Sequence, residues 1–527
     1  MTLKVLGDFA GSDYGVHLSG TGLLTSLALV AIWSTASFLR VRHWRRLKPG
    51  TQYPPHVWSW IPYLGSALDM THDHLRNFIL KHSKRLGNAK IFTATIAGSH
   101  CAFIADTDLV YLVFKDSILE IDSLSLQKRA MMNVFGETKE EVKKCFVVPE
   151  GEIAMKMIQQ YFVQNESLES TLQETQEILF HQIEHLVESK DDKLEERCSD
   201  GWSQMSLLTF CRKVIFFASV GPVVSKKLMD ESFMSDYTTF EKGIPFLFAG
   251  APSFVTRKSR AARVRLLDTL ENILVNFKDS QSDFMKARHK LFQGVFDTRL
   301  MAKGNLGMLL ASIANSIPAV FWTMCNILEN EECYRACREA VIKVAALREP
   351  GRNWFTLKEL DDLPILKSAF METLRLYQIF FIVREVEDDF IVNSKGSVSE
   401  PKFMLTKGTT IMALPNLVHM DPDIFEEPTK FQYDRFVDPN ARSKKGTLLT
   451  SHWKPFGGGA HLCPGRKFIT YEFQALLAMI LLKIDMRFAE GEGKPSVDLG
   501  RQGASVAQPK HDPTVEFCTR KPREAER

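Results

Sequence analysis

Apolar residues recur every three or four positions over most of the chain, the spacing of helices that bury one face. The helical stretches lie near residues 169–189, 203–219, 261–292, 305–346, 364–377 and 465–485. Segments in which apolar and polar residues alternate are few, and Lys90–Ile96 and Thr409–Ala413 are the clearest. The pattern predicts a mainly α-helical protein with a minor β-sheet region, folded as one compact unit.

One apolar stretch stands apart, because Gly22–Leu39 carries no charged residue. At 1.5 Å per residue, a helix of this length is about long enough to cross a hydrocarbon core of ~30 Å. Basic residues then cluster within nine positions, at Arg40, Arg42, Arg45, Arg46 and Lys48. The positive-inside rule places residues 1–21 as a lumenal tail and everything after residue 40 in the cytosol.

Two other interpretations of this stretch are a cleaved signal peptide and a buried helix. A signal peptide carries its basic residues before the apolar run, which is the reverse of the order here. The sequence therefore favours an uncleaved transmembrane anchor at 22–39. We expect the membrane to be that of the endoplasmic reticulum. A basic and proline-rich linker is expected at 40–65, followed by one large domain at 66–527.

Composition adds two exclusions. Lys and Arg total 66 against 63 Asp and Glu, and this formal net charge of +3 is too balanced for a dedicated nucleic-acid binder. The 9 cysteines are odd in number and scattered, as in proteins of a reducing compartment. We therefore expect no nucleic-acid partner and no disulfide framework.

The strongest chemical signal is the segment Lys454–Arg466, in which Gly457–Gly459 precede a cysteine. Glycines let the backbone approach a flat ligand closely. Cys463 stands just before a helical stretch, and the N-terminal end of a helix favours the thiolate form. Such a thiolate suits the axial position of a haem iron, and a buried cysteine in a glycine turn is the alternative.

The spacing of Phe456, Gly459, Cys463 and Gly465 resembles the haem-thiolate loop of the cytochrome P450 family, Phe-x-x-Gly-x-Arg-x-Cys-x-Gly. The resemblance implies the cytochrome P450 fold and a haem b whose iron is bound by Cys463. It also implies that 66–527 is a haem-binding catalytic domain. The cofactor-binding loop would contain Phe456, Gly457, His461, Cys463 and Gly465. His461 replaces the family's Arg and is a weaker, pH-dependent donor toward a haem propionate.

Two further motifs resemble the same family. Glu372 and Arg375 match its Glu-x-x-Arg helix, and Arg435 matches the third member of the same set. In the family this set is a buried ionic network that fixes the loop on the haem side. Arg384 resembles the strand arginine that pairs with a haem propionate, a task that suits the bidentate guanidinium.

The chain departs from the family pattern at two places. The family's Trp-x-x-x-Arg is absent, since no tryptophan lies between Trp60 and Trp202, and Lys128–Arg129 is the candidate substitute. Gln378 stands where a proline usually follows the Glu-x-x-Arg helix.

The oxygen-activating helix of the family is expected near residues 309–322. No Asp or Glu lies between Gly304 and Leu328, so Asn315 and Ser316 are the candidate catalytic residues. An amide can position water but cannot donate a proton of useful acidity, and a capping or packing role is the alternative for Asn315. Pro318 removes one helix hydrogen bond and predicts a kink at its own position. This pattern resembles the branch that holds sterol 7α- and 12α-hydroxylases and prostacyclin synthase.

The resemblance implies a haem-thiolate monooxygenase that hydroxylates a lipophilic, sterol- or terpenoid-like small molecule with O₂. Electrons would come from NADPH through a reductase that docks on the Cys463 side. An isomerase or dehydratase that rearranges a peroxide without a reductase is the alternative, and a haem-binding or membrane scaffold is a third. The phenylalanines of Phe240–Phe248 can line an apolar pocket, dip into the membrane or belong to the core.

Overall fold

The structure is a computed structural model and describes residues 50–59, 65–114, 121–148, 150–188, 202–349, 351–392 and 402–520. The predicted lumenal tail, the anchor at 22–39 and most of the linker lie outside these residues. The chain forms two compact units and returns to each of them more than once. The β-rich unit comprises residues up to Ser123, Phe381–Leu414 and Leu499–Gln502, and the helical unit comprises the remainder. The predicted domain boundaries stay predictions.

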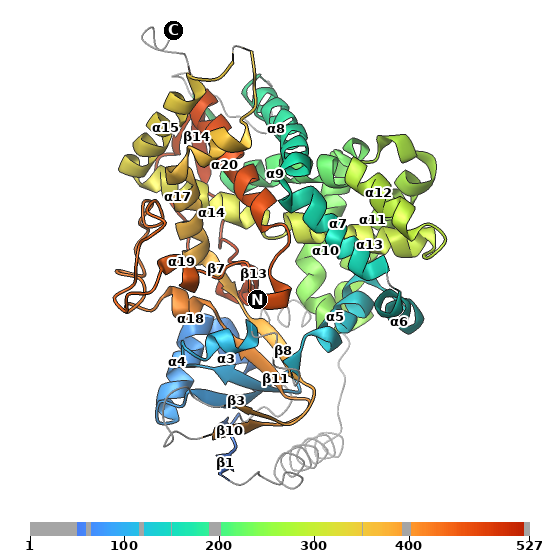
Figure 1. Cartoon of the computed structure of the whole chain (residues 1–527), viewed down its shortest axis with the longest axis vertical. Helices are drawn as coiled ribbons and strands as arrows, with labels where there is room; N and C mark the ends of the chain where they lie inside the picture. The colour runs from blue at the N-terminus through green and yellow to red at the C-terminus, as the bar shows by residue number, and fades with distance from the viewer. Residues whose placement is uncertain are drawn as a thin grey trace, which may run out of the picture. The chain divides into compact units, whose positions relative to one another are not determined.

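A six-stranded sheet forms the centre of the β-rich unit, in the order β2-β3-β4-β11-β8-β5 (Figure 1). A second, three-stranded sheet has the order β1-β10-β9. The elements of this unit are β1 (Thr51–Gln52), β2 (His56–Val57), α3 (Ala67–His72), α4 (Leu75–Arg85), β3 (Ile91–Ile96), β4 (Ser99–Ile104), η1 (Val110–Phe114), β5 (Ile121–Asp122), β8 (Ile382–Val386), β9 (Phe390–Val392), β10 (Lys402–Leu405), β11 (Thr410–Ala413) and η6 (Leu499–Arg501). The two strands predicted from alternation are confirmed as β3 and β11.

The hairpin between β3 and β4 has turn residues whose backbone conformation suits the twist of this sheet. Ala97 and Gly98 both have positive φ, 46° and 80°, which matches the right-handed twist of the flanking strands. Phe78 of α4 packs on the sheet, with its ring 5.4 Å from that of Phe103. β11 then pairs parallel to β4 and antiparallel to β8, so the sheet joins distant parts of the chain.

The helical unit contains most of the chain. Its helices are α5 (Leu124–Ala130), the π-helical turn η2 (Met131–Phe135), α6 (Lys139–Val147), α7 (Glu150–Val163), α8 (Asn165–Glu188), α9 (Leu207–Val223), η3 (Lys226–Leu228), α10 (Glu231–Phe248), α11 (Ser253–Asn276), η4 (Lys278–Ser280), α12 (Asp283–Phe292), α13 (Thr298–Ile313), α14 (Ser316–Glu329), α15 (Glu331–Ala345), α16 (Leu357–Asp361), α17 (Pro364–Tyr377), α18 (Asn416–His419), α19 (Leu449–His452), η5 (Gly459–His461) and α20 (Arg466–Lys483). Its strands are β6 (Ser203–Ser206), β7 (Gln378–Phe380), β12 (Ile484–Phe488), β13 (Ala504–Val506) and β14 (Thr514–Thr519).

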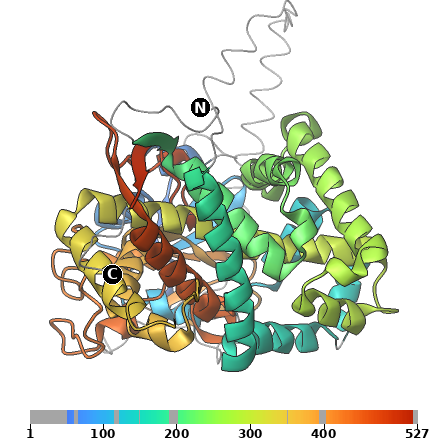
Figure 2. The ribbon, with the colours of Figure 1, turned by 90° about the horizontal axis from the view of Figure 1, so that it is seen from above.

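Helix α20 runs through the core of this unit, because it is buried on nearly all sides over Phe473–Leu481. It lies beside α8, and the two helices run side by side in teal and red in Figure 2. Phe473 meets Phe370 of α17 edge to face, with ring centres 4.4 Å apart. The helices predicted near 169–189, 364–377 and 465–485 are confirmed as α8, α17 and α20, and α17 has the predicted bounds. The predicted stretch 261–292 is two helices, because α11 ends at Asn276 and α12 begins at Asp283.

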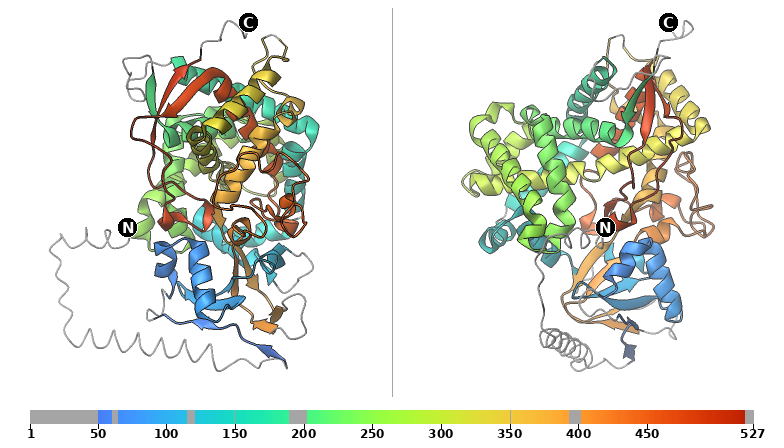
Figure 3. Two further views of the ribbon diagram at one scale, coloured as in Figure 1. Left: turned by 90° about the vertical axis from the view of Figure 1, so that its left-hand side faces the viewer. Right: turned by 180° about the vertical axis from the view of Figure 1, so that it is seen from behind.

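Residues 203–206 correct the prediction of a helix near 203–219. They form β6, which pairs with β14 in a sheet of order β12-β14-β6, and the helix begins only at Leu207. Figure 3 shows the green strand β6 beside the red strands β12 and β14. Four residues are too few to separate a helical from an alternating pattern, so pairing with a distant strand decides their structure.

The predicted helical stretch 305–346 is three helices rather than one. The break between α13 and α14 lies at Ala314–Asn315, four residues before Pro318, not at the proline itself. The proline has no N–H to donate to the carbonyl of Ala314, so the ladder opens there and Pro318 sits in the first turn of α14. Thr298–Glu329 is long and apolar enough to span a membrane, but 67% of its most apolar window is buried inside the protein, as in a core helix.

Glu472 generates a prediction about stability and pH. It is fully buried on α20, where Ser219 Oγ donates to its Oε1 at 3.4 Å, and burial raises the pKa of its carboxyl from 4.5 to about 8. As pH rises from about 4.5 to 8, the unfolded chain loses this proton while the folded chain keeps it, so folding stability falls by up to ~1.4 kcal/mol per pH unit. Glu472→Gln removes this loss, and we expect it to stabilise the protein at pH 8 but not at pH 4.5.

Urea unfolding of both proteins at the two pH values measures the difference. Glu490→Gln, at an exposed position, controls for the loss of one carboxylate. An equal effect of Glu472→Gln at both pH values would contradict a proton held on Glu472.

Candidate functional site

The loop before α20 has a backbone that only glycine adopts readily. Gly457 and Gly459 have positive φ, 79° and 61°, and a Cβ on Gly457 would come within 3.3 Å of the His461 carbonyl oxygen. The N–H of Cys463 donates to the Phe456 carbonyl at 2.9 Å. The glycines therefore fold residues 456–463 back on themselves and present Cys463 at the start of α20.

The sulfur of Cys463 is half-buried beside the first backbone N–H groups of α20. Burial raises the pKa of this thiol, whereas hydrogen bonds from the Gly465 and Arg466 amides and the charge of Arg466 act in the opposite direction. The amides at the helix start therefore lower the pKa of the thiol, as predicted, but burial raises it by more. A bound metal ion deprotonates such a thiol outright, and the two amides then stabilise the thiolate.

A buried ionic network lies on α17 and the segment after it. Glu372 and Arg375 are completely buried, and two guanidinium nitrogens donate to the two carboxylate oxygens at 2.7 and 2.8 Å. Arg435 Nε donates to the same carboxylate at 3.0 Å. Arg375 also donates to the carbonyls of His419 at 2.6 Å and Pro428 at 2.7 Å. The three residues singled out in the sequence therefore meet, and they hold the chain that leads toward Cys463.

Two residues that the sequence analysis missed connect this network to the cysteine loop. Trp453 Nε1 donates to the Met371 carbonyl at 2.9 Å, and its ring meets that of Phe456 edge to face at 5.7 Å. His419 Nε2 accepts the backbone N–H of Lys454 at 3.1 Å. Neither residue belongs to a motif quoted above, because each acts through a main-chain group of a distant segment.

Asn315 and Ser316 stand at the break between α13 and α14. Asn315 Oδ1 accepts the backbone N–H of Val506 on β13 at 3.1 Å, and Ser316 Oγ donates back to the Ser312 carbonyl at 2.6 Å. Trp322, two turns further along α14, donates to the Ala507 carbonyl at 2.6 Å. The helix break and β13 are thus joined by side chains.

Two residues at the C-terminal end of α13 and in the break after it are exposed to solvent. Ala311 and Asn315, one turn apart, are exposed, although their neighbours Leu309, Ile313 and Ile317 are completely buried or nearly so. These two residues are therefore accessible to water or to a ligand, although the helix around them is largely buried.

The other candidate residues occupy different surroundings. Arg384 lies on β8 in the β-rich unit, 6% exposed, and Nη1 donates to the Val383 carbonyl at 2.9 Å. His461 is exposed in η5, and Phe456 is partly buried. Lys128 lies over the ring of Phe146 at 5.5 Å, which gives it a partner on α6. The propionate roles of Arg384 and His461 stay predictions.

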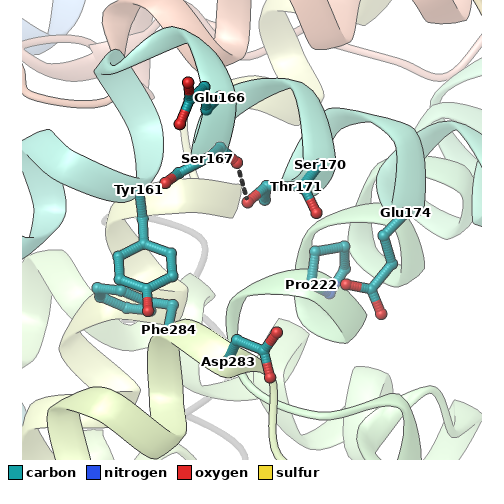
Figure 4. A pocket seen from close by; sticks show the side chains of 9 residues that line it. All are labelled: Tyr161, Glu166, Ser167, Ser170, Thr171, Glu174, Pro222, Asp283 and Phe284. Atoms are coloured by element: carbon teal, nitrogen blue, oxygen red, sulfur yellow. Dashed lines mark hydrogen bonds between the residues drawn. The ribbon is translucent and has the colours of Figure 1, made fainter.

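A separate cavity of about 320 Å³ lies among α7, α8, α9 and α12 (Figure 4). Its wall carries the carboxylates of Glu166, Glu174 and Asp283, and two of them already pair with Lys226 and Lys286. This polar, open hollow does not match a lipophilic substrate.

The residues around Cys463 fit the haem that the sequence predicts. Within the part of the chain that the structure describes, no three His, Cys, Asp or Glu side chains gather as a metal site. A lone sulfur with two amide donors, on a glycine loop that a flat ring can approach, suits a metal whose other ligands come from a macrocycle.

Comparison with known proteins gives a consistent result. The family model described as Cytochrome P450 matches residues 55–515. Cholesterol 7-alpha-monooxygenase of Cricetulus griseus is 26% identical, over 93% of this chain and 98% of that protein. The 7-alpha-hydroxycholest-4-en-3-one 12-alpha-hydroxylase of Oryctolagus cuniculus is 28% identical, over 94% of this chain and 98% of the relative.

A solved structure supports the fold alone. The retinoic acid bound cyanobacterial CYP120A1 superposes with a TM-score of 0.68 at 18% identity, over 89% of this chain and 100% of that chain. The mainly helical architecture with minor sheets is therefore the one that the sequence analysis expected.

The buried network predicts a large loss of stability when Glu372 is removed. Glu372→Ala leaves Arg375 and Arg435 without their carboxylate, and uncompensated buried charge of this kind costs ~3–5 kcal/mol. Asp283→Ala breaks an exposed i,i+3 pair with Lys286 and should cost less than ~1 kcal/mol. Urea unfolding measures the loss of stability in each variant. Equal losses in Glu372→Ala and Asp283→Ala would contradict a buried ionic network that stabilises the fold.

Proposed function

The chain belongs to the cytochrome P450 family and is a monooxygenase, and from this premise we propose that it hydroxylates a sterol-like or terpenoid-like small molecule. The observation that carries the proposal is the glycine-folded loop that presents Cys463 on the amides of Gly465 and Arg466. The sterol class is supported by the names of the two hydroxylases above, each aligned over nearly the whole chain.

Cys463 would bind the iron of a haem b through its sulfur, in a loop with Phe456, Gly457, His461 and Gly465. Haem supplies the activation of O₂, and a thiolate ligand favours cleavage of the O–O bond. The chain would contribute the position of the sulfur, since the Phe456 carbonyl accepts the Cys463 N–H and the amides of Gly465 and Arg466 donate to the sulfur.

Asn315 and Ser316 are proposed to handle water and protons on the α13–α14 side. The Oδ1 of Asn315 already accepts from Val506, so its Nδ2 group is the part left to orient a water molecule. The Ser316 hydroxyl donates to Ser312, which leaves its oxygen lone pairs to accept. Water held by these groups would replace the acid that is missing between Gly304 and Leu328.

Membrane attachment completes the proposal. The uncharged stretch 22–39 and its basic flank support a single-pass anchor in the endoplasmic reticulum, with the catalytic part in the cytosol beside an NADPH-dependent reductase. Among the phenylalanines of α10, Phe240 is completely buried, whereas Phe246 is 55% exposed. Phe240 therefore belongs to the core, and Phe246 is available to an apolar environment.

Reconstitution tests this function. The purified protein with haem, a P450 reductase, NADPH and a panel of sterols should give hydroxylated products that depend on both O₂ and NADPH. Cys463→Ser should lose the thiolate-type Soret band of the reduced CO complex together with the products. Product formed from a hydroperoxide without reductase, and none from sterols with it, would favour a peroxide isomerase instead.

Asn315 has its own prediction. Asn315→Ala removes the group that orients water, and we expect product formed per NADPH to fall about tenfold while the CO spectrum stays unchanged. Asn315→Asp keeps the acceptor for Val506 and adds an acid, so it should retain more coupled turnover than alanine. Product and NADPH consumption are measured together. Equal coupling in the wild type and Asn315→Ala would assign Asn315 to packing alone.

A further inference from the structure

Helix α18 connects the buried network to the segment that leads to Cys463. It is one turn long, Asn416–His419, and packs against α17 (Figure 1). His419 is completely buried. Its carbonyl accepts Arg375 Nη1 at 2.6 Å, and its ring Nε2 accepts the Lys454 N–H at 3.1 Å. One residue therefore bonds to the ionic network with its main chain and to the cysteine loop with its side chain.

The ring of His419 must be neutral for this arrangement. Burial and the nearby charge of Arg375 lower the pKa of His419 to about 3. Since Nε2 accepts a hydrogen bond, the ring proton lies on Nδ1, which has no hydrogen-bond partner among the described residues. The ring meets Phe425 edge to face at 6.4 Å, so its remaining surroundings include an apolar contact. The hydrogen bond from the Lys454 N–H to Nε2 is thus the polar contact between the ring and the cysteine loop.

The loop has an unbroken path from this contact to the sulfur. Lys454 precedes Pro455 and Phe456, and the Phe456 carbonyl accepts the N–H of Cys463 at 2.9 Å. The Gly457 N–H donates to the Lys454 carbonyl at 3.2 Å, so Lys454 also bounds the glycine turn. A displacement of Lys454 therefore moves both the turn and the carbonyl that holds Cys463.

We propose that His419 is a positioning residue whose Nε2 fixes Lys454 and thereby the Cys463 loop to the Glu372–Arg375 network. This rests on the proposed function of Cys463 as the haem ligand. In this proposal, Lys454 is held by the hydrogen bond to the Nε2 atom and not by the volume of the imidazole ring. His82 offers a matched contrast, because it is a buried histidine in the β-rich unit, packed on Phe78 at 4.6 Å, with no partner for its Nε2 among the described residues.

Four substitutions in the full-length, haem-loaded protein separate acceptor from volume. His419→Gln places an oxygen near the position of Nε2, His419→Asn places it near Nδ1, and His419→Phe keeps a ring without an acceptor. His82→Phe controls for the loss of a buried imidazole. The first readout is the reduced CO spectrum, as the ratio of the thiolate-type band to the band of haem that has lost its thiolate. The second is the hydrogen exchange of the Lys454 amide.

We expect His419→Phe and His419→Asn to lower the band ratio and to accelerate exchange at Lys454 by about tenfold, the factor carried by one buried hydrogen bond. His419→Gln should stay within about twofold of the wild type, and His82→Phe should change neither readout. A drop in His419→Gln as large as in His419→Phe would assign the residue to packing and overturn the proposal, as would an unchanged His419→Phe. If His419→Phe does not accumulate, the Gln and Asn pair decides, and equal ratios in that pair overturn the proposal. Absence of a thiolate-type band in the wild type would overturn the proposed function itself.

Discussion

The segment between α17 and the Cys463 loop is held by an ion pair that is completely buried. Glu372 and Arg375 are completely buried, and their desolvation is offset only because every part of the guanidinium finds an acceptor, from the carboxylate to the carbonyls of His419 and Pro428. This requirement removes freedom from the connecting segment, since the carbonyls must stay where Arg375 needs them. The irregular chain between His419 and Lys430 is thus held in one path by hydrogen bonds to Arg375.

Much of the fold and part of the site follow from local patterns in the sequence. The periodicity of 364–377 predicts α17 because one apolar face repeats over four turns, and the Glu-x-x-Arg spacing places both charges on that helix. The glycines before Cys463 predict a tight turn, and Gly457 and Gly459 have positive φ in the structure. These features depend on residues close together in the chain, so the sequence displays them directly.

The contacts that escaped prediction are long-range and involve the main chain. Residues 203–206 became a strand because β14 pairs with them, some 300 residues later in the chain. The partners of Asn315 and His419 are the amides of Val506 and Lys454, and an amide is present at every non-proline residue. The side chains of Val506 and Lys454 therefore give no indication that the backbone N–H of each residue donates to a distant side chain.

The parallel pairing of β11 with β4 affects how the protein is made. Thr410 faces Cys101, so the partner of β4 leaves the ribosome roughly 300 residues after β4 itself. At 5–20 residues per second, the β3–β4 hairpin waits on the order of half a minute with one edge unpaired. The nascent chain carries an open sheet edge for most of its synthesis, and its exposure to aggregation is greatest before residue 413 has been translated.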